Sequence, residues 1–283
     1  MMTLTIRFSL LLLTTSILFF SSCKQDNTLE EGKIIPYTLV NRSGIMVEQF
    51  DSTVTDENRY NYDNKVFKVG TKFLYDYTFV SALGDTLLYN LTSTEGDWEF
   101  RTPKEADDET IRQFEIGVKN GLKPMIDWYP NYYQTLLSYT YPPQTTYSLT
   151  GAIENKANLW IHPPRVAMFK ILELNPFPFI KYPLEEGKTW EWTLEVGSSW
   201  ADVRWKTWEG VISNKSVYTV GKTKTVSTPF GELNCTEIKA VATSELGETR
   251  LNMLFHPEKG FIHLDYTNID RSKLLLKQVK SDE

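Results

Sequence analysis

The sequence is poor in the residues that usually hold metal ions, with two cysteines and three histidines among 283 residues. Two cysteines allow at most one disulfide, which excludes a fold held together by disulfides and a cysteine-rich metal site. The histidines, His162, His256 and His263, lack the close spacing of a zinc-binding pair. We therefore expect neither a metal centre nor a bound cofactor.

The chain also lacks a run of basic residues, and its 36 acidic and 30 basic residues give a net charge of −6. An acidic chain without a basic patch lacks the positively charged surface that binds nucleic-acid phosphates, so no nucleic-acid partner is expected. No G-x-S-x-G motif is present. Acidic pairs such as Glu185-Glu186 occur, but a glycosidase needs two acids that face each other in space. We assign no catalytic residue and favour a binding protein over an enzyme.

A short hydrophobic stretch, Phe8–Phe20, lies near the N-terminus, with Arg7 before it and two serines after it. It is shorter than the roughly 18 apolar residues that cross a membrane, and this arrangement is typical of a secretory signal. The next four-residue window, Phe20-Ser21-Ser22-Cys23, resembles the lipobox of bacterial lipoproteins, with Phe20 in place of the usual Leu. The alternative is a plain signal peptide followed by an incidental cysteine.

The lipobox resemblance implies that residues 1–22 are a signal peptide and that Cys23 carries a diacylglycerol and an amide-linked fatty acid such as palmitate. Two or three acyl chains anchor a protein in a bilayer without a transmembrane helix. Lys24 follows Cys23, in place of the Asp that commonly retains lipoproteins in the inner membrane. The resemblance therefore implies a lipid-anchored protein of the bacterial outer membrane, on its periplasmic or surface face.

After a polar tether at residues 23–33, the sequence predicts one all-β domain at residues 34–283. Aromatic residues make up 13% of the chain and favour strands. They alternate on one face of residues 71–80, which predicts a hairpin with residues 86–92. We expect an antiparallel sandwich or open barrel with long aromatic and proline-rich loops. Its strands can form two sub-sheets, from residues 34–180 and 181–283.

Turn signals at short intervals divide the second half of the chain into strands. We predict them at residues 187–196, 205–213, 216–226, 233–242, 249–255, 261–266 and 273–279. The apolar phase changes between Cys235 and Ile238, so we expect a β-bulge near Thr236-Glu237 and a buried, unbridged Cys235. Residues 103–120 fit a helix or a strand, and we favour a strand after an acidic loop. Residues 131–138 fit a short helix.

An ordered set of short motifs spans residues 182–262. It comprises Tyr182-Pro183-Leu184, Gly187-Lys188-Thr189-Trp190, TPFGELNC at residues 228–235, SELG at 244–247 and FHPEKGFI at 255–262. In this order the motifs resemble a family of exported bacterial β-proteins of unknown function, sometimes named TapB-like. The resemblance implies a β-rich domain that faces the periplasm, and it supplies no catalytic residue.

The segment NLWIHPPR at residues 158–165 holds three candidate ligand-binding residues, Trp160, His162 and Arg165. Two prolines stiffen the backbone beside them. Trp160 offers a stacking face, and Arg165 offers a planar fork for carboxylate, phosphate or sugar oxygens. The alternative is a structural loop in which Arg165 donates hydrogen bonds to backbone carbonyls.

Five tryptophans lie close together in the sequence: Trp190, Trp192, Trp200, Trp205 and Trp208. Packing in the core of a sheet explains them most simply, and the alternative is that some line an apolar or sugar-binding groove. The lead hypothesis is a membrane-anchored, non-enzymatic envelope lipoprotein that binds a hydrophobic or glycan ligand or a partner. The alternatives are a glycan-binding or glycan-hydrolysing surface lipoprotein and a purely structural envelope component.

The lipid anchor can be tested by replacing the cysteine. We expect Cys23→Ser to abolish incorporation of labelled fatty acid and to leave an uncleaved or soluble protein, because the thiol is the acceptor of the lipid. Metabolic labelling and membrane fractionation measure the two effects. Unchanged labelling together with unchanged fractionation would contradict the lipobox assignment.

Overall fold

The structure, a computed structural model, describes residues 35–92, 97–121 and 132–282. Cys23, the signal peptide and the tether lie outside these ranges. The described chain is nearly all β, which confirms the expected fold class, and none of its helices is long and apolar enough to cross a membrane. The strands are β1 (Tyr37–Arg42), β2 (Ile45–Phe50), β3 (Lys72–Val80), β4 (Thr86–Leu91), β5 (Trp98–Arg101), β6 (Gln113–Lys119), β7 (Thr135–Thr140), β8 (Tyr147–Glu154), β9 (Asn158–Ile161), β10 (Phe179–Lys181), β11 (Thr189–Gly197), β12 (Val211–Thr228), β13 (Gly231–Ser244), β14 (Gly247–His256), β15 (Gly260–Thr267) and β16 (Lys273–Asp282). Three short 3-10 helices accompany them: η1 (Arg59–Asn61), η2 (Ala167–Leu174) and η3 (Ser198–Trp200).

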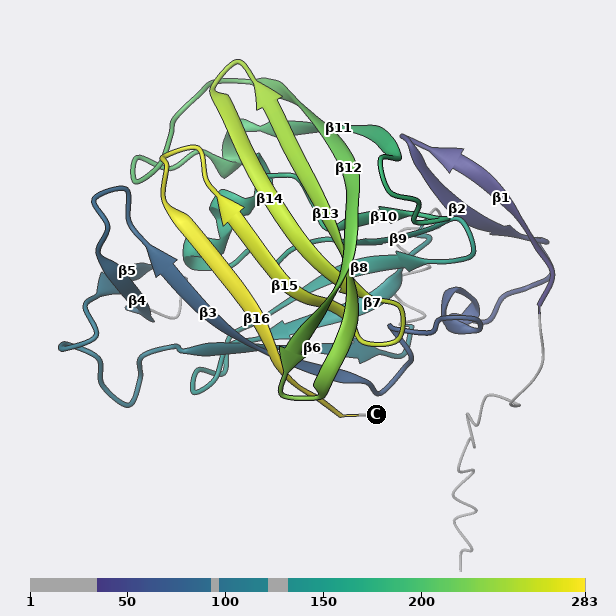
Figure 1. Cartoon of the computed structure of the whole chain (residues 1–283), viewed down its shortest axis with the longest axis horizontal. Helices are drawn as coiled ribbons and strands as arrows, with labels where there is room; N and C mark the ends of the chain where they lie inside the picture. The colour runs from purple at the N-terminus through teal and green to yellow at the C-terminus, as the bar shows by residue number, and fades with distance from the viewer. Residues whose placement is uncertain (1–34, 93–96, 122–131, 283) are drawn as a thin grey trace, which may run out of the picture. The chain divides into compact units, whose positions relative to one another are not determined.

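One antiparallel sheet of fourteen strands forms an open barrel (Figure 1). Its order is β10-β9-β8-β7-β6-β3-β16-β15-β14-β13-β12-β11, and the ribbon β4–β5 branches from β3. The end strands β10 and β11 are not paired with each other. Side chains close the gap between them, with Phe179 packed edge-on against Trp190 and Trp192 at 6.1 and 6.3 Å.

The two ranges suggested as sub-sheets, residues 34–180 and 181–283, meet within this one sheet. Strand β3 from the first range pairs with β16 from the second along most of its length. The boundary between the ranges falls inside β10, which is one free edge of the barrel, with β11 as the other. Strands β1 and β2 form a separate two-stranded sheet.

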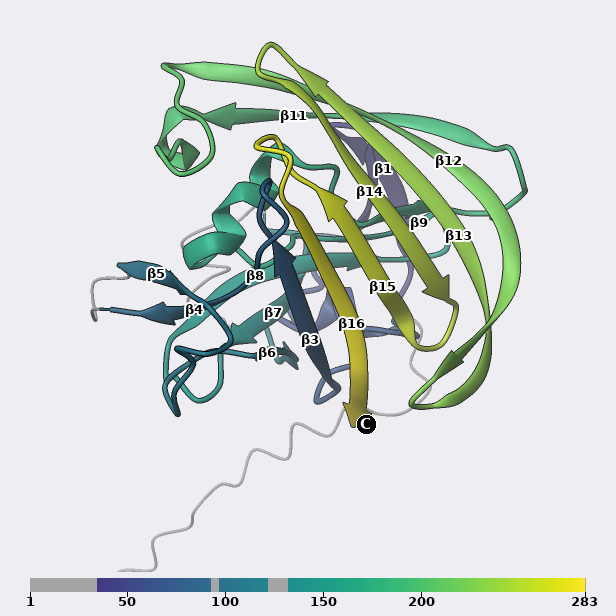
Figure 2. The same cartoon turned by 60° about the vertical axis from the view of Figure 1, so that its left-hand side comes forward.

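The interior of the barrel is filled by an inner segment, residues 163–178, which includes η2 (Figure 2). Alternate residues of the wall strands point inward, as the burial pattern of β3 shows. From η2 come Met168, Phe169, Ile171, Leu172 and Leu174, each at most 2% exposed. The ring of Phe169 lies at the centre of four wall rings, with centroids 5.4–5.8 Å away, from Tyr77, Tyr89, Phe114 and Tyr141.

Wall side chains also donate hydrogen bonds to backbone carbonyls at and within the inner segment. The pairs are Tyr139 Oη to His162 O at 2.7 Å, Thr249 Oγ1 to Leu174 O at 2.7 Å and Tyr218 Oη to Phe177 O at 2.9 Å. Buried carbonyls outside regular ladders need such donors, because an unpaired polar group is costly in an apolar interior. Packing and hydrogen bonding therefore hold the segment in one position.

Several local predictions are confirmed. Strands β3 and β4 form the expected hairpin, and residues 113–119 form a strand after an acidic loop. The pairing of β12 with β13 shifts opposite Glu237, where β12 has two residues, Gly221 and Lys222, against one. A bulge is therefore present at the expected position, but its extra residue lies on β12. Strand β13 pairs with β14 without a shift from Thr236 to Ser244, so the bulge is not on the strand whose phase change predicted it. Cys235 is buried and unbridged, and burial raises the pKa of its thiol.

Three local predictions are wrong. Of the strand expected at residues 205–213, only residues 211–213 belong to β12, and residues 205–210 lie in the loop before it. The other two errors lie where sheet pairing is continuous. The expected turn at Ser213–Lys215 lies inside β12, which runs unbroken for 18 residues. Asn214 is 2% exposed there, because its side chain faces the barrel interior as part of the strand alternation. The short helix at residues 131–138 is also wrong from residue 135 onward, since Thr135–Thr140 pair with β6 and β8. In both places sheet pairing overrides the local preference of polar turn residues.

A buried carboxylate lies where the β1–β2 hairpin packs on the barrel. Met46 of the hairpin exchanges hydrogen bonds with Asn158 of β9 at 2.8 and 3.0 Å. Glu48 is 4% exposed. Burial raises the pKa of Glu48 to about 7, with Asp63 and Glu154 adding to the rise, although hydrogen bonds from its own amide and Asn155 oppose it.

The inner segment provides a stability test. We expect Phe169→Ala to lower the free energy of unfolding by about 3–5 kcal/mol, because it leaves a cavity among four rings. Lys170→Ala, at an exposed neighbouring position of η2, should change it by less than about 0.5 kcal/mol. Denaturant unfolding followed by tryptophan fluorescence measures both. Equal effects of the two variants would contradict a filled interior.

Glu48 provides a test of pH dependence. A carboxyl whose pKa is higher in the folded chain than in the unfolded chain binds more protons when folded. Its contribution to stability is therefore lost as the pH rises from the unfolded pKa of 4.5 to the folded pKa of about 7. We expect Glu48→Gln to lose less stability than the unmodified chain between pH 5 and pH 8, by up to about 3 kcal/mol. The exposed variant Glu232→Gln should follow the unmodified chain in urea unfolding. Parallel pH curves for Glu48→Gln and the unmodified chain would refute the coupling.

Candidate functional site

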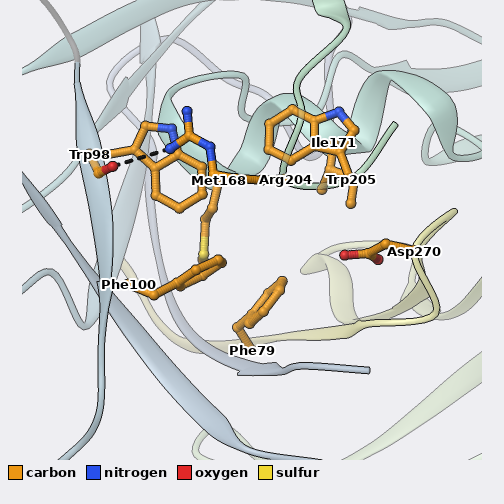
Figure 3. A pocket seen from close by; sticks show the side chains of 8 residues that line it. All are labelled: Phe79, Trp98, Phe100, Met168, Ile171, Arg204, Trp205 and Asp270. Carbon is orange, nitrogen blue, oxygen red and sulfur yellow. Dashed lines mark hydrogen bonds between the residues drawn. The ribbon is translucent and has the colours of Figure 1, made fainter. Parts of the chain in front are cut away.

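An apolar cavity lies where strands β3 and β5, the helix η2 and two connecting segments meet (Figure 3). It encloses about 210 Å³ of empty space, including its open mouth. Its walls are six apolar and two charged side chains: Phe79, Trp98, Phe100, Met168, Ile171, Trp205, Arg204 and Asp270. The room between them in this structure suffices for about one water molecule.

Separate parts of the chain supply these side chains. Phe79 lies near the end of β3 and stacks on Phe100 of β5 at 4.7 Å. Trp98 of β5 lies nearly parallel to Trp205 of the β11–β12 loop, with centroids 6.3 Å apart. Met168 and Ile171 come from η2. The inner segment is therefore the floor of the cavity, and β5 and the β11–β12 loop are two of its walls.

Arg204 connects those two walls. Its guanidinium carbon lies 3.9 Å from the centroid of the Trp98 ring, and its Nη1 donates a hydrogen bond to the Trp98 carbonyl at 3.1 Å (Figure 3). Its Nε and Nη2 donate to the two carboxylate oxygens of Asp202, both at 2.8 Å. Cation–π and bidentate contacts of this kind orient a guanidinium firmly. Arg204 thus holds the β11–β12 loop against β5.

The two charged side chains at the cavity already form hydrogen bonds within the protein. Burial raises the pKa of Asp202, but the hydrogen bonds and charge of Arg204 outweigh this effect, so the pKa is lowered overall. Asp270 accepts hydrogen bonds from the amide and hydroxyl of Ser272 at 2.9 and 2.6 Å. The lining is consequently mainly apolar, with Arg204 paired to Asp202 and Asp270 hydrogen-bonded to Ser272.

A second hollow lies between the turn at Ser43-Gly44 and strand β11. It is wide open, and it is lined mainly by polar side chains, including Glu191 and Glu195. Glu191 is paired with Lys215 at 2.9 Å. A ligand in such a groove stays largely in contact with water, whereas binding sites usually bury most of their ligand. The cavity at the barrel end is the better candidate.

The structure places the three residues singled out in the sequence away from this cavity. Trp160 is 6% exposed and packs against Phe177 and Trp192. His162 contacts the Trp160 ring edge-on, and its Nε2 lies 3.1 Å from Oε1 of the buried Glu173. Arg165 is half-buried, and its Nη2 donates to the Leu149 carbonyl at 3.0 Å. Trp160 and His162 are therefore in contact with each other, whereas Arg165 is hydrogen-bonded to Leu149. The role of these three residues in ligand binding stays a prediction.

Sequence reasoning missed most of the cavity. Trp205 belongs to the tryptophan cluster noted above, and Phe79 belongs to the alternating strand, but both patterns indicate core packing equally well. Nothing in the sequence connects Phe100 with Met168 or Ile171, both of which follow it by about seventy positions. A signal was present in the loop at residues 198–210, where three tryptophans alternate with charged residues. Within the described ranges, no group of three or more His, Cys, Asp or Glu side chains is arranged to hold a metal ion.

Comparison with known proteins gives only distant likenesses. No family model matches the chain, and no curated protein matches it in sequence, so the TapB-like resemblance stays a prediction. Among solved structures, an exported protein with a YmcC-like fold from Bacteroides fragilis is 12% identical, with a TM-score of 0.42 over 77% of this chain and 98% of that one. A protein described as a lipoprotein from Parabacteroides distasonis is 11% identical, with a TM-score of 0.39 over 77% and 97%. The hypothetical lipoprotein YmcC of Escherichia coli is 8% identical, with a TM-score of 0.32 over 82% and 98%.

Proposed function

We propose that this chain is a lipid-anchored lipoprotein of the bacterial outer membrane that binds the apolar part of a ligand in the cavity at the barrel end. The anchor is argued from the lipobox at Cys23 and the signal-like stretch before it. The binding function is argued from one observation, the six apolar side chains that line a hollow at the open end of a filled barrel. Apolar hollows of this kind favour apolar ligands over water.

The chemistry of the lining favours a hydrocarbon chain over a charged or sugar ligand. Arg204 is paired with Asp202, and Asp270 already accepts two hydrogen bonds from Ser272, so both charged side chains of the lining interact with the protein itself. A sugar usually stacks on an exposed aromatic face. The tryptophans of the sheet that would provide one, Trp190 and Trp192, are 6% and 7% exposed. We therefore favour a fatty acyl chain over the glycan alternative.

Entry of a ligand requires the cavity to widen, because it now has room for about one water molecule. The ribbon β4–β5 is the part best able to move. Strand β4 pairs with β3 through two residues, and a single bridge joins Tyr89 to Ile111. The Arg204–Trp98 contact holds this ribbon against the β11–β12 loop. Loss of the Arg204–Trp98 contact would therefore open the cavity.

Photo-crosslinking of a diazirine derivative of palmitic acid to the full lipidated chain in isolated envelopes tests the proposal. We expect attachment at peptides that line the cavity. Met168→Trp should reduce it about tenfold, since the larger side chain fills the hollow. Arg204→Ala should increase it about tenfold, because one cation–π contact and one hydrogen bond no longer hold the walls together.

Arg250→Ala is the matched control for Arg204→Ala. Arg250 also forms an ion pair with the acid two residues before it, Glu248, but it is an exposed residue of β14 that does not line the cavity. Crosslinking of the Arg250→Ala variant should equal that of the unmodified chain. Attachment spread over the whole chain and unaffected by Met168→Trp would refute binding in this cavity.

A further inference from the structure

The two most exposed large hydrophobic side chains of the described residues lie on loops that adjoin elements lining this cavity. Leu83 and Val203 are each 91% exposed, and the next, Val211, is 66% exposed. Leu83 lies in the turn after β3, four residues beyond the lining residue Phe79. Val203 directly precedes the lining residue Arg204. We define the mouth rim as the three connecting segments at residues 81–85, 198–210 and 268–272. Figures 1 and 2 both show these segments side by side.

We propose that the mouth rim binds the surface of a phospholipid bilayer, with Leu83 and Val203 inserted among the acyl chains. This interaction goes beyond ligand binding in the cavity and does not depend on it. An isolated apolar side chain at the tip of a loop gains little from water and much from the hydrocarbon boundary of a membrane. Two such tips on neighbouring loops can enter the same bilayer together.

The base of the rim has the composition of a membrane interface. Trp200 and Trp208 are partly exposed and pack against the core cluster from the β11–β12 loop. The indole N–H of Trp208 donates to the Val196 carbonyl at 3.4 Å. Tryptophan concentrates at the level of lipid head groups because its ring is apolar and its N–H is polar. The rim therefore presents aliphatic tips with aromatic side chains behind them.

The exposed charges at the rim suit anionic lipid head groups. On the rim or directly beside it, five basic side chains and two acidic ones are exposed: Lys170, Arg204, Lys206, Arg271 and Lys273, with Asp85 and Glu209. Asp202 is paired with Arg204, and Asp270 accepts hydrogen bonds from Ser272. With the partly buried Asp202 and Asp270 included, these side chains carry five positive and four negative charges, on a chain whose net charge is −6. Basic residues beside apolar tips strengthen attachment to membranes that contain anionic lipids.

A bilayer fits these features better than a protein partner does. A stable protein interface buries about 800 Å² on each side and has a continuous apolar centre. Leu83 and Val203 protrude from separate loops and are not part of a continuous patch. The tether also permits contact with the membrane that holds the lipid. Fourteen residues from Cys23 to Tyr37 reach up to about 50 Å, comparable with the diameter of about 45 Å expected for a domain of this length.

Site-specific fluorescence on the full lipidated chain, reconstituted in phosphatidylethanolamine–phosphatidylglycerol vesicles, tests the proposal. Val203→Cys and Leu83→Cys would each carry an NBD label, and Leu275→Cys, exposed on the outer face of β16, is the control. The natural Cys235 is buried and does not compete for the label. Doxyl-labelled lipids should quench NBD at positions 83 and 203 at least about twofold more than at position 275. This expectation follows from insertion of the tips to the acyl boundary.

The outcomes separate this proposal from the others. Equal quenching at positions 83, 203 and 275 would overturn membrane docking. A change in NBD emission that requires added envelope proteins, without quenching by lipid, would show a protein partner instead and would also overturn it. Adding Met168→Trp should leave the quenching unchanged, because that substitution fills the cavity and does not alter the rim. Failure of acyl crosslinking with quenching intact would therefore refute the cavity ligand alone.

Discussion

The need to fill the interior of the open barrel governs the rest of this structure. A sheet of this many strands encloses more space than its own inward side chains fill, since about eight strands is the size at which wall side chains alone suffice. Here the chain passes between the walls and contributes η2, whose apolar side chains are almost fully buried. Phe169 alone contacts rings from β3, β4, β6 and the segment after β7. The walls thus keep their curvature because they pack on a common centre.

Placing the inner segment inside the barrel also buries backbone carbonyls that need hydrogen-bond donors. The inner segment holds four prolines, at positions 163, 164, 176 and 178, and proline has no N–H. Its carbonyls cannot all be satisfied by a regular ladder. Hydroxyls of Tyr139, Tyr218 and Thr249 meet the demand from the walls. The many tyrosines of the sheet therefore serve packing and hydrogen bonding at once, which explains why an aromatic-rich core tolerates a segment without sheet pairing.

The cavity follows from where that filling ends. Met168 and Ile171 are at most 2% exposed and form its floor, while Lys170 between them is exposed. The space above them is enclosed by β5 and the β11–β12 loop, which belong to different parts of the chain and are joined by Arg204 and Trp98. Binding in the cavity and contact of the rim with lipid are compatible, because the same end of the barrel would then face the source of an acyl chain.

The sequence by itself determined the strand content of this protein. The aromatic alternation of β3 and most turns of the second half are local patterns, and the structure contains the elements that they predict. Where a segment's partner lies far away, the local pattern was insufficient: the polar residues Ser213–Lys215 resemble a turn, yet β11 and β13 pair with both sides of them. Only the tertiary structure decided that residues 163–178 enter the barrel, that Trp160 is buried and that Phe79, Phe100 and Met168 share a cavity. These are contacts between residues remote in sequence, and their formation depends on the closure of the whole sheet, which local propensity does not encode.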